Sequence, residues 1–178
     1  MIKILVADDE EDMELLIRQK FRQKIREQAY DFVFAANGKE ALEQLNQHPD
    51  ISIVLSDINM PEMDGLTLLS KLGESNPLVK TVMVSAYGDM DNIRTAMNGG
   101  AFDFVTKPVN FEDLRVTVEK TIQHVNHLKE SRKHARENAI LRMYVDENVL
   151  DFMGGREVDS ALVQNEIVEG TVAFIDIC

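Results

Sequence analysis

The sequence contains few of the residues that would indicate a secreted, membrane-embedded or nucleic-acid-binding protein. It has one cysteine, Cys178, which excludes an internal disulfide framework and fits a reducing cytoplasm. No apolar run approaches the length of a membrane span. The 19 Lys and Arg residues are outnumbered by 31 Asp and Glu, and the formal charge of −12 argues against broad binding to nucleic acids or anionic membranes.

Residue patterns that mark common catalytic classes are absent too. There is no Gly-rich phosphate loop, no Cys-x-x-Cys pair and no Gly-x-Ser-x-Gly elbow. His124 and His127 are three residues apart, which would place them on one helical face, but no carboxylate or cysteine completes a metal site there. We therefore expect both histidines to lie on a helix surface.

The sequence does contain a regular alternation of strand and helix patterns. Its 178 residues, 44% of them hydrophobic, can bury one full domain and a smaller appendage. We expect strands at residues 2–7, 31–35, 51–56, 80–85 and 101–106. We expect amphipathic helices around residues 13–25, 38–47, 65–73 and 89–98, and a fifth from Phe111 with Asn110 as its N-cap. This alternation predicts an α/β fold with a parallel sheet covered on both faces.

Acidic residues stand where two of the predicted strands end. Asp57 follows the apolar run 51–56, and Asp8 and Asp9 follow the run 2–7. Ligands of open α/β sheets bind beyond the carboxyl ends of the strands, so these side chains lie where chemistry is usually done. Three clustered aspartates predict a bound divalent cation that neutralises them. The alternative for Asp8 and Asp9 is a solvated helix N-terminus, where acids are favoured.

The last predicted helix continues beyond the length that a compact domain needs. No Pro or Gly occurs from Glu112 to Met143. Apolar positions spaced by four and three residues form a seam typical of a two-stranded coiled coil. The seam consists of Leu114, Val118, Thr121, Val125 and Leu128. We expect Leu114 and Val118 to pack on their own domain and the seam from Val125 onward to face a partner helix, which predicts a parallel homodimer.

Several short motifs together resemble the receiver domain of two-component response regulators. They are Asp8-Asp9, Ala36-Asn-Gly-x-Glu-Ala-Leu42, Asp57 with Met60-Pro-x-Met-Asp-Gly65, Ser85-Ala86, Gly100-Ala-Phe-Asp-Phe104 and Lys107-Pro108. The resemblance covers residues 1–123. It implies a flavodoxin-like, doubly wound sheet of five parallel strands in the order 2-1-3-4-5, with an extended C-terminal helix.

The resemblance also implies a role for each site residue. Asp57 would accept a phosphoryl group from a histidine kinase or phosphotransfer protein. Mg²⁺ would be held by Asp9, Asp57 and the Asn59 backbone carbonyl, with Asp8 placing a coordinated water. Lys107 and Ser85 would contact phosphoryl oxygens. Taken singly, Lys107 could be any exposed lysine and Ser85 a helix cap.

A conformational switch is implied by the same family. Ser85 would move toward the phosphoryl group and Phe104 would turn inward, with helix 89–98, strand 101–106 and the helix from Phe111 as the output surface. The alternative for Phe104 is a plain core phenylalanine. Asn59 and Tyr87 would flank the pocket and tune the lifetime of the phosphorylated state.

The C-terminal residues resemble part of a second family. The run Glu166–Cys178 is similar to the opening strand of class III nucleotidyl cyclases, in which Asp176 would be the first metal-binding aspartate. This predicts a signalling helix over residues 124–146 and the start of an output domain over 147–178. The alternative is a tail with an incidental aspartate. Two-metal catalysis needs a second aspartate, so we expect no enzymatic turnover from this chain beyond receiver chemistry.

Two other functions remain open at this point. One is a haloacid-dehalogenase-like aspartyl phosphatase, which also uses a nucleophilic aspartate, although Asn59 stands where that family has a second, acidic aspartate. The other is a dimerisation module that is never phosphorylated. The predicted location is the cytoplasm, with no membrane or nucleic-acid partner.

Overall fold

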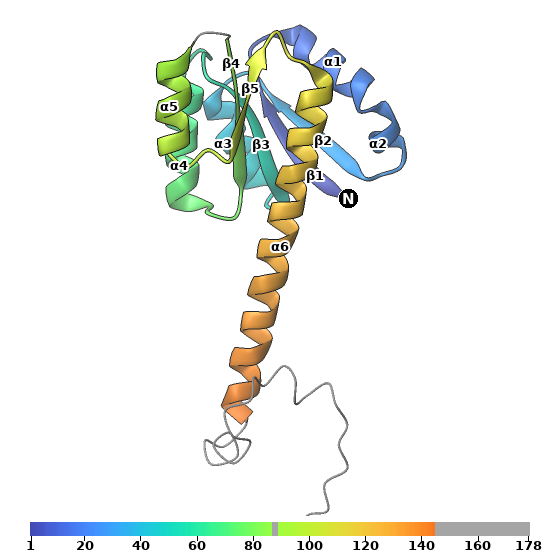
Figure 1. The fold of residues 1–178 in the computed structure, drawn as a ribbon, viewed down its shortest axis with the longest axis vertical. Helices are drawn as coiled ribbons and strands as arrows, with labels where there is room; N and C mark the ends of the chain where they lie inside the picture. The colour runs from blue at the N-terminus through green and yellow to red at the C-terminus, as the bar shows by residue number, and fades with distance from the viewer. Residues whose placement is uncertain (87–88, 145–178) are drawn as a thin grey trace, which may run out of the picture. The chain divides into compact units, whose positions relative to one another are not determined.

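In the computed structural model, which describes residues 1–86 and 89–144, strands and helices alternate along the chain (Figure 1). The strands are β1 (Ile2–Ala7), β2 (Tyr30–Ala35), β3 (Ile51–Asp57), β4 (Lys80–Ala86) and β5 (Asp103–Lys107). The helices are α1 (Glu11–Lys20), α2 (Arg22–Arg26), α3 (Gly38–Gln47), α4 (Gly65–Ser75), α5 (Met90–Asn98) and α6 (Phe111–Tyr144).

The strands form one parallel sheet in the order β2-β1-β3-β4-β5. This confirms the predicted doubly wound, flavodoxin-like fold. β3 lies in the middle of the sheet and every one of its residues is buried. A strand covered on both faces needs apolar residues at successive positions rather than alternate ones, which is why the run from Ile51 is nearly continuous.

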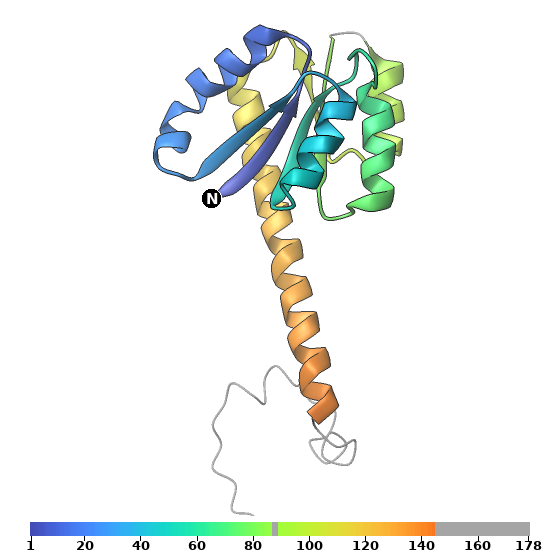
Figure 2. The same cartoon turned by 180° about the vertical axis from the view of Figure 1, so that it is seen from behind.

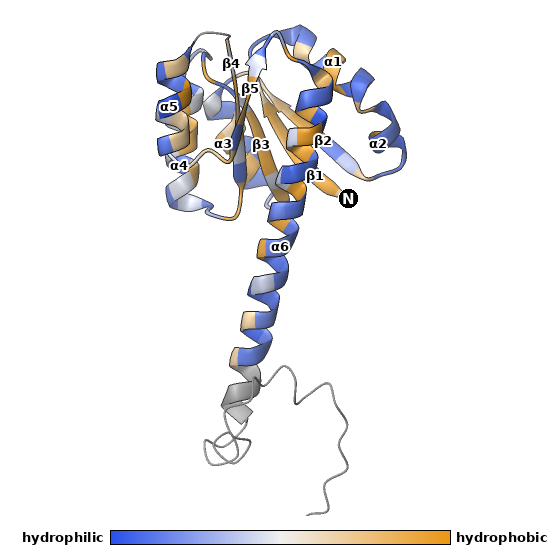
Figure 3. Cartoon of the chain, in the orientation of Figure 1, coloured by the Kyte–Doolittle hydropathy of each residue, from blue (hydrophilic) through white to orange (hydrophobic). Residues whose placement is uncertain are grey.

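Helices cover both faces of the sheet, and β1 shows how its side chains divide between them. Ile4 and Val6 pack with residues of α1 and α6, whereas Leu5 and Ala7 pack with residues of α3 and α4. Successive side chains of a strand point to opposite faces, so β1 contributes to both cores. Figure 2 shows α3 and α4 in front of the sheet, and Figure 3 shows the apolar strands between the polar outer faces of the helices.

The first predicted helix is interrupted but keeps its apolar face. α1 and α2 are separated at Phe21, whose φ and ψ of −95° and 11° are not those of a regular helix. The Phe21 N–H still donates to the Ile17 carbonyl at 2.9 Å, and the Ile25 N–H donates to the Phe21 carbonyl at 3.0 Å. Met13, Ile17 and Phe21 are buried together, as their spacing predicts.

The fifth strand begins two residues later than predicted, at Asp103 rather than 101. The reason lies in the end of α5. Gly100 has a φ of +93°, a conformation that glycine adopts without steric cost. The Ala101 N–H then donates to the Ala96 carbonyl at 3.0 Å, so Ala101 belongs to the helix cap.

Helix α6 packs on the sheet over more of its length than predicted. Leu114 and Val118 are buried in the core that contains β1 and α1, as expected. Val125 lies in the same core and is only 2% exposed, so the prediction that it faces a partner helix is wrong. The sheet reaches this far because the start of β3 also contributes, and Lys129 Nζ donates to the buried Ser52 hydroxyl at 2.7 Å.

Some predictions fall on residues outside the described ones. These are the pocket role of Tyr87, the last two residues of the 124–146 helix, and the output-domain start at 147–178 with Asp176. Contacts group Met1–Lys129 into one compact unit. Within residues 1–86 and 89–144, none of the helices combines the length and the apolar character needed to cross a membrane.

Candidate functional site

The sheet register brings the predicted site residues to one edge. Ala7 is paired with Ser56, Asp57 with Val84, and Ala86 with Lys107. The ends of β1, β3, β4 and β5 are therefore aligned, and the loops that follow them carry Asp8, Asp9 and Asn59. This alignment follows from parallel pairing, since all carboxyl ends meet at the same edge.

Asp57 is held at this edge by a close approach of the chain to itself. The Gly65 N–H donates to the Ile58 carbonyl at 2.9 Å, which folds the loop after β3 back onto the strand. A Cβ atom on Gly65 would lie 2.0 Å from the Asp57 carbonyl oxygen, so only glycine fits. Asp64 caps α4 by accepting from the Thr67 N–H at 2.7 Å.

Lys107 reaches into a group of carboxylates from β1, β3 and the start of α1. Its Nζ donates to Asp57 Oδ2 and to Glu10 Oε1, each at 2.7 Å, and lies 3.1 Å from Asp8 Oδ2. Burial lowers the pKa of the Lys107 ammonium, but the hydrogen bonds to these carboxylates outweigh it and raise the pKa above its ordinary value. Lys107 is therefore a fixed positive charge beside Asp57. The Lys107–Pro108 peptide bond is cis.

Asp8, Asp9 and Asp57 form the cluster that the sequence predicts. One carboxylate oxygen from each lies within 4.8 Å of the others. Burial raises the pKa of the Asp8 carboxyl, although the Glu10 N–H and the Lys107 ammonium counteract this effect. Carboxylate oxygens are the ligands that Mg²⁺ prefers, and a cation would relieve the repulsion among these three groups. The residues present therefore fit a magnesium ion.

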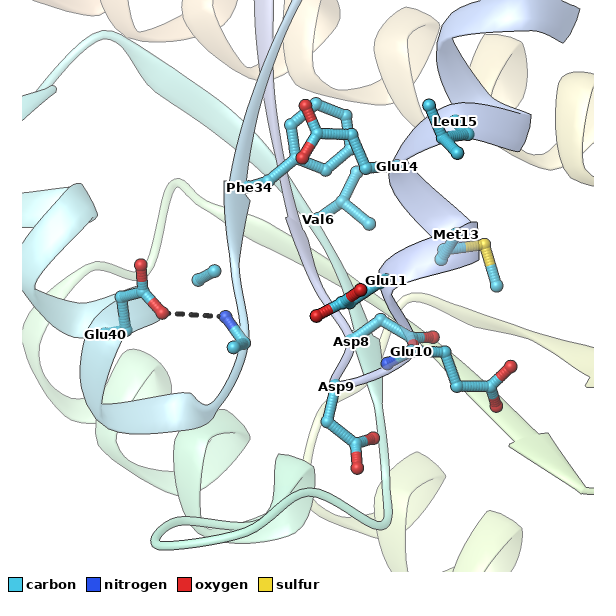
Figure 4. A pocket seen from close by; sticks show the side chains of 12 residues that line it. Val6, Asp8, Asp9, Glu10, Glu11, Met13, Glu14, Leu15, Phe34 and Glu40 are labelled. Carbon is cyan, nitrogen blue, oxygen red and sulfur yellow. Dashed lines mark hydrogen bonds between the residues drawn. The ribbon is translucent and has the colours of Figure 1, made fainter.

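A cleft opens beside this cluster, between the start of α1 and the end of β2. Asp8, Asp9, Glu10 and Glu40 are among the acids that line it (Figure 4). Glu40 is engaged in local structure, because it accepts from the Ala36 N–H at 2.8 Å in a capping arrangement with Asn37 at the start of α3. The cleft therefore has acidic walls beside the aspartate cluster.

Two further predicted site residues lie at the same edge. Ser85 is fully buried near the end of β4, and its hydroxyl has no hydrogen-bond partner among the described residues. The Asn59 N–H donates to Asp57 Oδ1 at 3.3 Å, and the Asn59 side chain is exposed. The use of the Asn59 carbonyl as a metal ligand stays a prediction.

Phe104 is not a core residue in this structure. It is 38% exposed on β5 and lines a shallow depression with Thr106, Asp113 and Thr117. The alternative that Phe104 is a plain core phenylalanine is therefore wrong. An aromatic side chain on the surface can still turn inward, so the predicted switch role remains open.

Glu10 was not among the predicted site residues. The sequence shows it only as the third acid after β1, and its contact is with a lysine 97 positions away. Only the tertiary arrangement of β1 and β5 reveals that contact.

Comparison with known proteins identifies the family. The model of the response regulator receiver domain matches residues 4–119. The chain belongs to the response regulator receiver family. It is 31% identical over 125 residues to the Escherichia coli K12 transcriptional regulatory protein ZraR, a match that spans 70% of this chain and 27% of ZraR. With the E. coli K12 DNA-binding transcriptional regulator NtrC, it shares 37% identity over 97 residues, which is 54% of this chain and 20% of NtrC.

Solved receiver structures show the same fold. The receiver domain protein from Clostridium thermocellum superposes with a TM-score of 0.65 at 27% identity, over 72% of this chain and 99% of that one. The receiver domain of the Francisella response regulator 1452 gives a TM-score of 0.61 at 29% identity, over 70% of this chain and 98% of that one. The receiver therefore accounts for most of the described residues, whereas the chain spans only about a quarter of the length of ZraR. The family match favours phosphorylation-dependent signalling over the phosphatase alternative.

Proposed function

We propose that the receiver acts as a switch whose Asp57 carboxylate accepts a phosphoryl group from a histidine kinase or phosphotransfer protein. One observation carries this proposal. Asp57 is buried at the end of β3, bonded to the Lys107 ammonium at 2.7 Å, and grouped with Asp8 and Asp9 in a cluster that fits Mg²⁺.

The chemistry explains why these residue types are needed together. A carboxylate is a weak nucleophile and is repelled by a phosphoryl dianion. Asp8, Asp9 and Asp57, with the Asn59 carbonyl, would hold Mg²⁺, which when bound neutralises negative charge on the carboxylates and on the phosphoryl oxygens. Asp57 then needs no strong base, because a carboxylate attacks without losing a proton.

Lys107 and Ser85 are placed to stabilise the phosphoryl group once it has arrived. The Lys107 ammonium lies 2.7 Å from Asp57 Oδ2, where it can form an ion pair with an oxygen of the phosphoryl group. The buried Ser85 hydroxyl lacks a partner among the described residues, and an unsatisfied buried hydroxyl is costly. A phosphoryl oxygen would satisfy it, which supplies a driving force for moving β4.

The signal would leave the receiver through α5, β5 and α6. Exposed Phe104 would turn inward as Ser85 moves, and this change would alter the surface from which α6 starts. A parallel homodimer through α6 stays part of the proposal. Its seam must begin after Val125, because Val125 is buried in the receiver itself. Leu128, the last seam position, is half-buried, whereas Arg132 and Ala135, the next two positions in the same 4-3 register, are exposed.

The output of the complete protein is a separate proposal. The similarity of Glu166–Cys178 to a cyclase opening strand favours a nucleotidyl cyclase, with Asp176 as a metal ligand. These residues lie outside the described part of the chain, and the family match ends at residue 119. The names of ZraR and NtrC describe transcriptional regulators, which makes DNA-binding output the second candidate. A cytoplasmic location is likewise a proposal that the single cysteine supports.

Labelling with a small phosphodonor tests the proposed function. The protein is incubated with acetyl phosphate and Mg²⁺, and the added phosphoryl group is detected by intact mass and by mobility on phosphate-affinity gels. We expect one hydroxylamine-sensitive phosphoryl group per chain, absent in Asp57→Asn and after chelation of Mg²⁺. Sustained hydrolysis of phosphate esters would instead support the phosphatase, and a wild-type protein that is never labelled would contradict the proposal.

Dimerisation is tested on the same samples by light scattering after size exclusion. We expect the fraction of dimer to rise on phosphorylation of the wild-type protein and to stay constant in Asp57→Asn. Association that is identical in both proteins, with and without donor, would support the constitutive dimerisation module.

A further inference from the structure

Glu10 occupies a position that normally supports a helix, but its side chain is used elsewhere. It is the N-cap residue of α1, with φ and ψ of −82° and 110°, and its side chain makes no capping hydrogen bond. Acids at this position usually accept hydrogen bonds from the free N–H groups of the first turn or interact favourably with the helix dipole. Here the carboxylate accepts a hydrogen bond from Lys107 Nζ at 2.7 Å instead.

This contact competes with the task proposed for Lys107. An ammonium has three N–H donors. Two of them are directed at Asp57 Oδ2 and Glu10 Oε1, and Asp8 Oδ2 is 3.1 Å from the nitrogen. All the nearby acceptors are carboxylates, so a phosphoryl oxygen would compete with them for the Lys107 ammonium.

Glu10 is the partner with no other assignment in the site. Asp57 is the proposed phosphoacceptor, and Asp8 belongs to the predicted metal cluster. The side chain of Glu10 is 61% exposed, whereas that of Asp8 is 3% exposed, so Glu10 can turn into water at little cost. It is therefore the contact that can open without rebuilding the pocket.

We infer that Glu10 is a positioning residue that holds the Lys107 ammonium in the unphosphorylated receiver and must release it as the phosphoryl group arrives. The inference rests on the proposed phosphoacceptor function of Asp57. With acetyl phosphate as donor, a bond forms between an Asp57 oxygen and phosphorus, the bond between phosphorus and the acetate oxygen breaks, and acetate leaves with the electron pair. The contact with Glu10 competes with the ion pair between Lys107 and the phosphoryl oxygens, so Glu10 slows the transfer.

A purely electrostatic role for Glu10 is the alternative to a positioning contact. Glu11 is the natural control, because it carries the same charge one residue later. It makes no hydrogen bond or ion pair within the described part of the chain, and Figure 4 shows Glu10 and Glu11 pointing to opposite sides. If the negative charge itself slows labelling of Asp57, removing the charge of either residue should raise the rate. If the contact with Lys107 slows it, only changes at Glu10 should do so.

The test uses the full chain with saturating Mg²⁺ and a series of acetyl phosphate concentrations. Glu10→Gln removes the charge, and Glu10→Asp keeps the charge but is one methylene too short to reach Lys107. We expect both variants to raise the limiting labelling rate of Asp57 about three- to fivefold. This is the change in rate expected when the barrier no longer includes breaking one half-exposed ion pair. Glu11→Gln should keep the wild-type limiting rate.

A spectroscopic measurement reports on the contact directly. The ammonium resonance of Lys107, followed by ¹⁵N NMR, should shift in Glu10→Gln relative to wild type while the receiver is unphosphorylated. It should be the same in both proteins when beryllofluoride, a phosphoryl mimic, is bound with Mg²⁺. Thermal unfolding checks that each variant is folded.

The possible failures are distinguishable. A wild-type protein that is never labelled overturns the proposed function and this inference with it. A labelled wild type with unchanged rates in Glu10→Gln and Glu10→Asp overturns the inference alone. Faster labelling in Glu10→Gln and Glu11→Gln but not in Glu10→Asp assigns the effect to charge and also overturns the inference. A Lys107 resonance that is identical in unphosphorylated wild type and Glu10→Gln overturns the inference too.

Discussion

At the scale of single residues, the pocket concentrates negative charge at the expense of stability. Asp8, Asp9 and Asp57 offer oxygens within 4.8 Å of one another, and burial raises the pKa of Asp8. Lys107 is the cation that faces them among the described residues. Functional sites commonly lower the stability of the folded protein in this way, so a variant that removes one of the charges should be more stable.

The variant Asp8→Asn removes one of these charges without changing the side-chain shape. We expect it to unfold at a higher temperature than wild type in metal-free buffer, with a gain on the order of 1 kcal/mol. Mg²⁺ should stabilise wild type and have much less effect on Asp8→Asn. Calorimetry with and without Mg²⁺ measures both effects, and a metal-free protein that Asp8→Asn destabilises would show that the cluster is not repulsive.

Gly65 tests the geometry that places Asp57. In Gly65→Ala the new Cβ atom would collide with the Asp57 carbonyl oxygen at 2.0 Å, so the strand end must move. We expect a loss of about 2 kcal/mol or more and strongly reduced phosphodonor labelling. Gly73→Ala is the matched control in the same helix, because its Cβ would meet nothing within 4 Å. It should label normally and gain about 0.5–1 kcal/mol from helix propensity.

At the scale of elements, α6 serves two purposes along its length. Its first turns complete the core on one face of the sheet, as Leu114, Val118 and Val125 show. Residues 130–139 are almost all exposed, and within the described part of the chain the side chains of Lys133 and Glu137 are paired with near neighbours of the same helix. The 4-3 spacing runs through both the packed and the exposed segment of α6, so spacing alone does not show where packing on the sheet ends.

Two valines of α6 separate core packing from a partner interface. Val125 is 2% exposed and Val116 is 51% exposed. We expect Val125→Ala to lower the unfolding free energy by about 2 kcal/mol at any protein concentration, from lost burial and a cavity. Val116→Ala should change it by less than about 0.5 kcal/mol. Denaturant titrations at two protein concentrations measure this, and a cost of Val125→Ala that depends on concentration would place Val125 in a dimer interface after all.

At the scale of the whole molecule, the receiver is larger than the segment its motifs delimit. The family match ends at residue 119 and the resemblance at 123, but the compact unit extends to Lys129. Val125 and the 2.7 Å hydrogen bond from Lys129 Nζ to Ser52 lie in the additional segment. This segment ties α6 to the start of β3, the strand that carries Asp57 at its other end.

Two fragments test this boundary. Residues 1–133 keep Val125, Lys129 and one helical turn beyond, so we expect their unfolding free energy to match the full chain within about 0.5 kcal/mol. Residues 1–120 lose these contacts and should be less stable by about 3 kcal/mol or more. Chemical unfolding followed by circular dichroism compares them, and equal stability of the two fragments would contradict a structural role for residues 121–133.

The sequence by itself determined the fold and most of the site. Apolar runs of strand length alternating with helical periodicity specify a parallel sheet, because each face must be covered. Acids at the ends of β1 and β3 and a lysine at the end of β5 then meet at one edge, since parallel strands align their carboxyl ends. Helix α3 begins and ends at the residues predicted, 38–47, because Asn37 supplies a local cap.

Only the tertiary structure decided which groups touch across long sequence separations. The heptad seam contained no sign that Val125 is covered by its own sheet, because burial depends on how far that sheet extends beneath the helix. The exposure of Phe104 depends on which face of β5 the neighbouring helices leave open. Glu10 joins the site because β5 delivers Lys107 beside the start of α1. Local patterns encode which face a residue takes, whereas the choice of partner is made by the packing of distant elements.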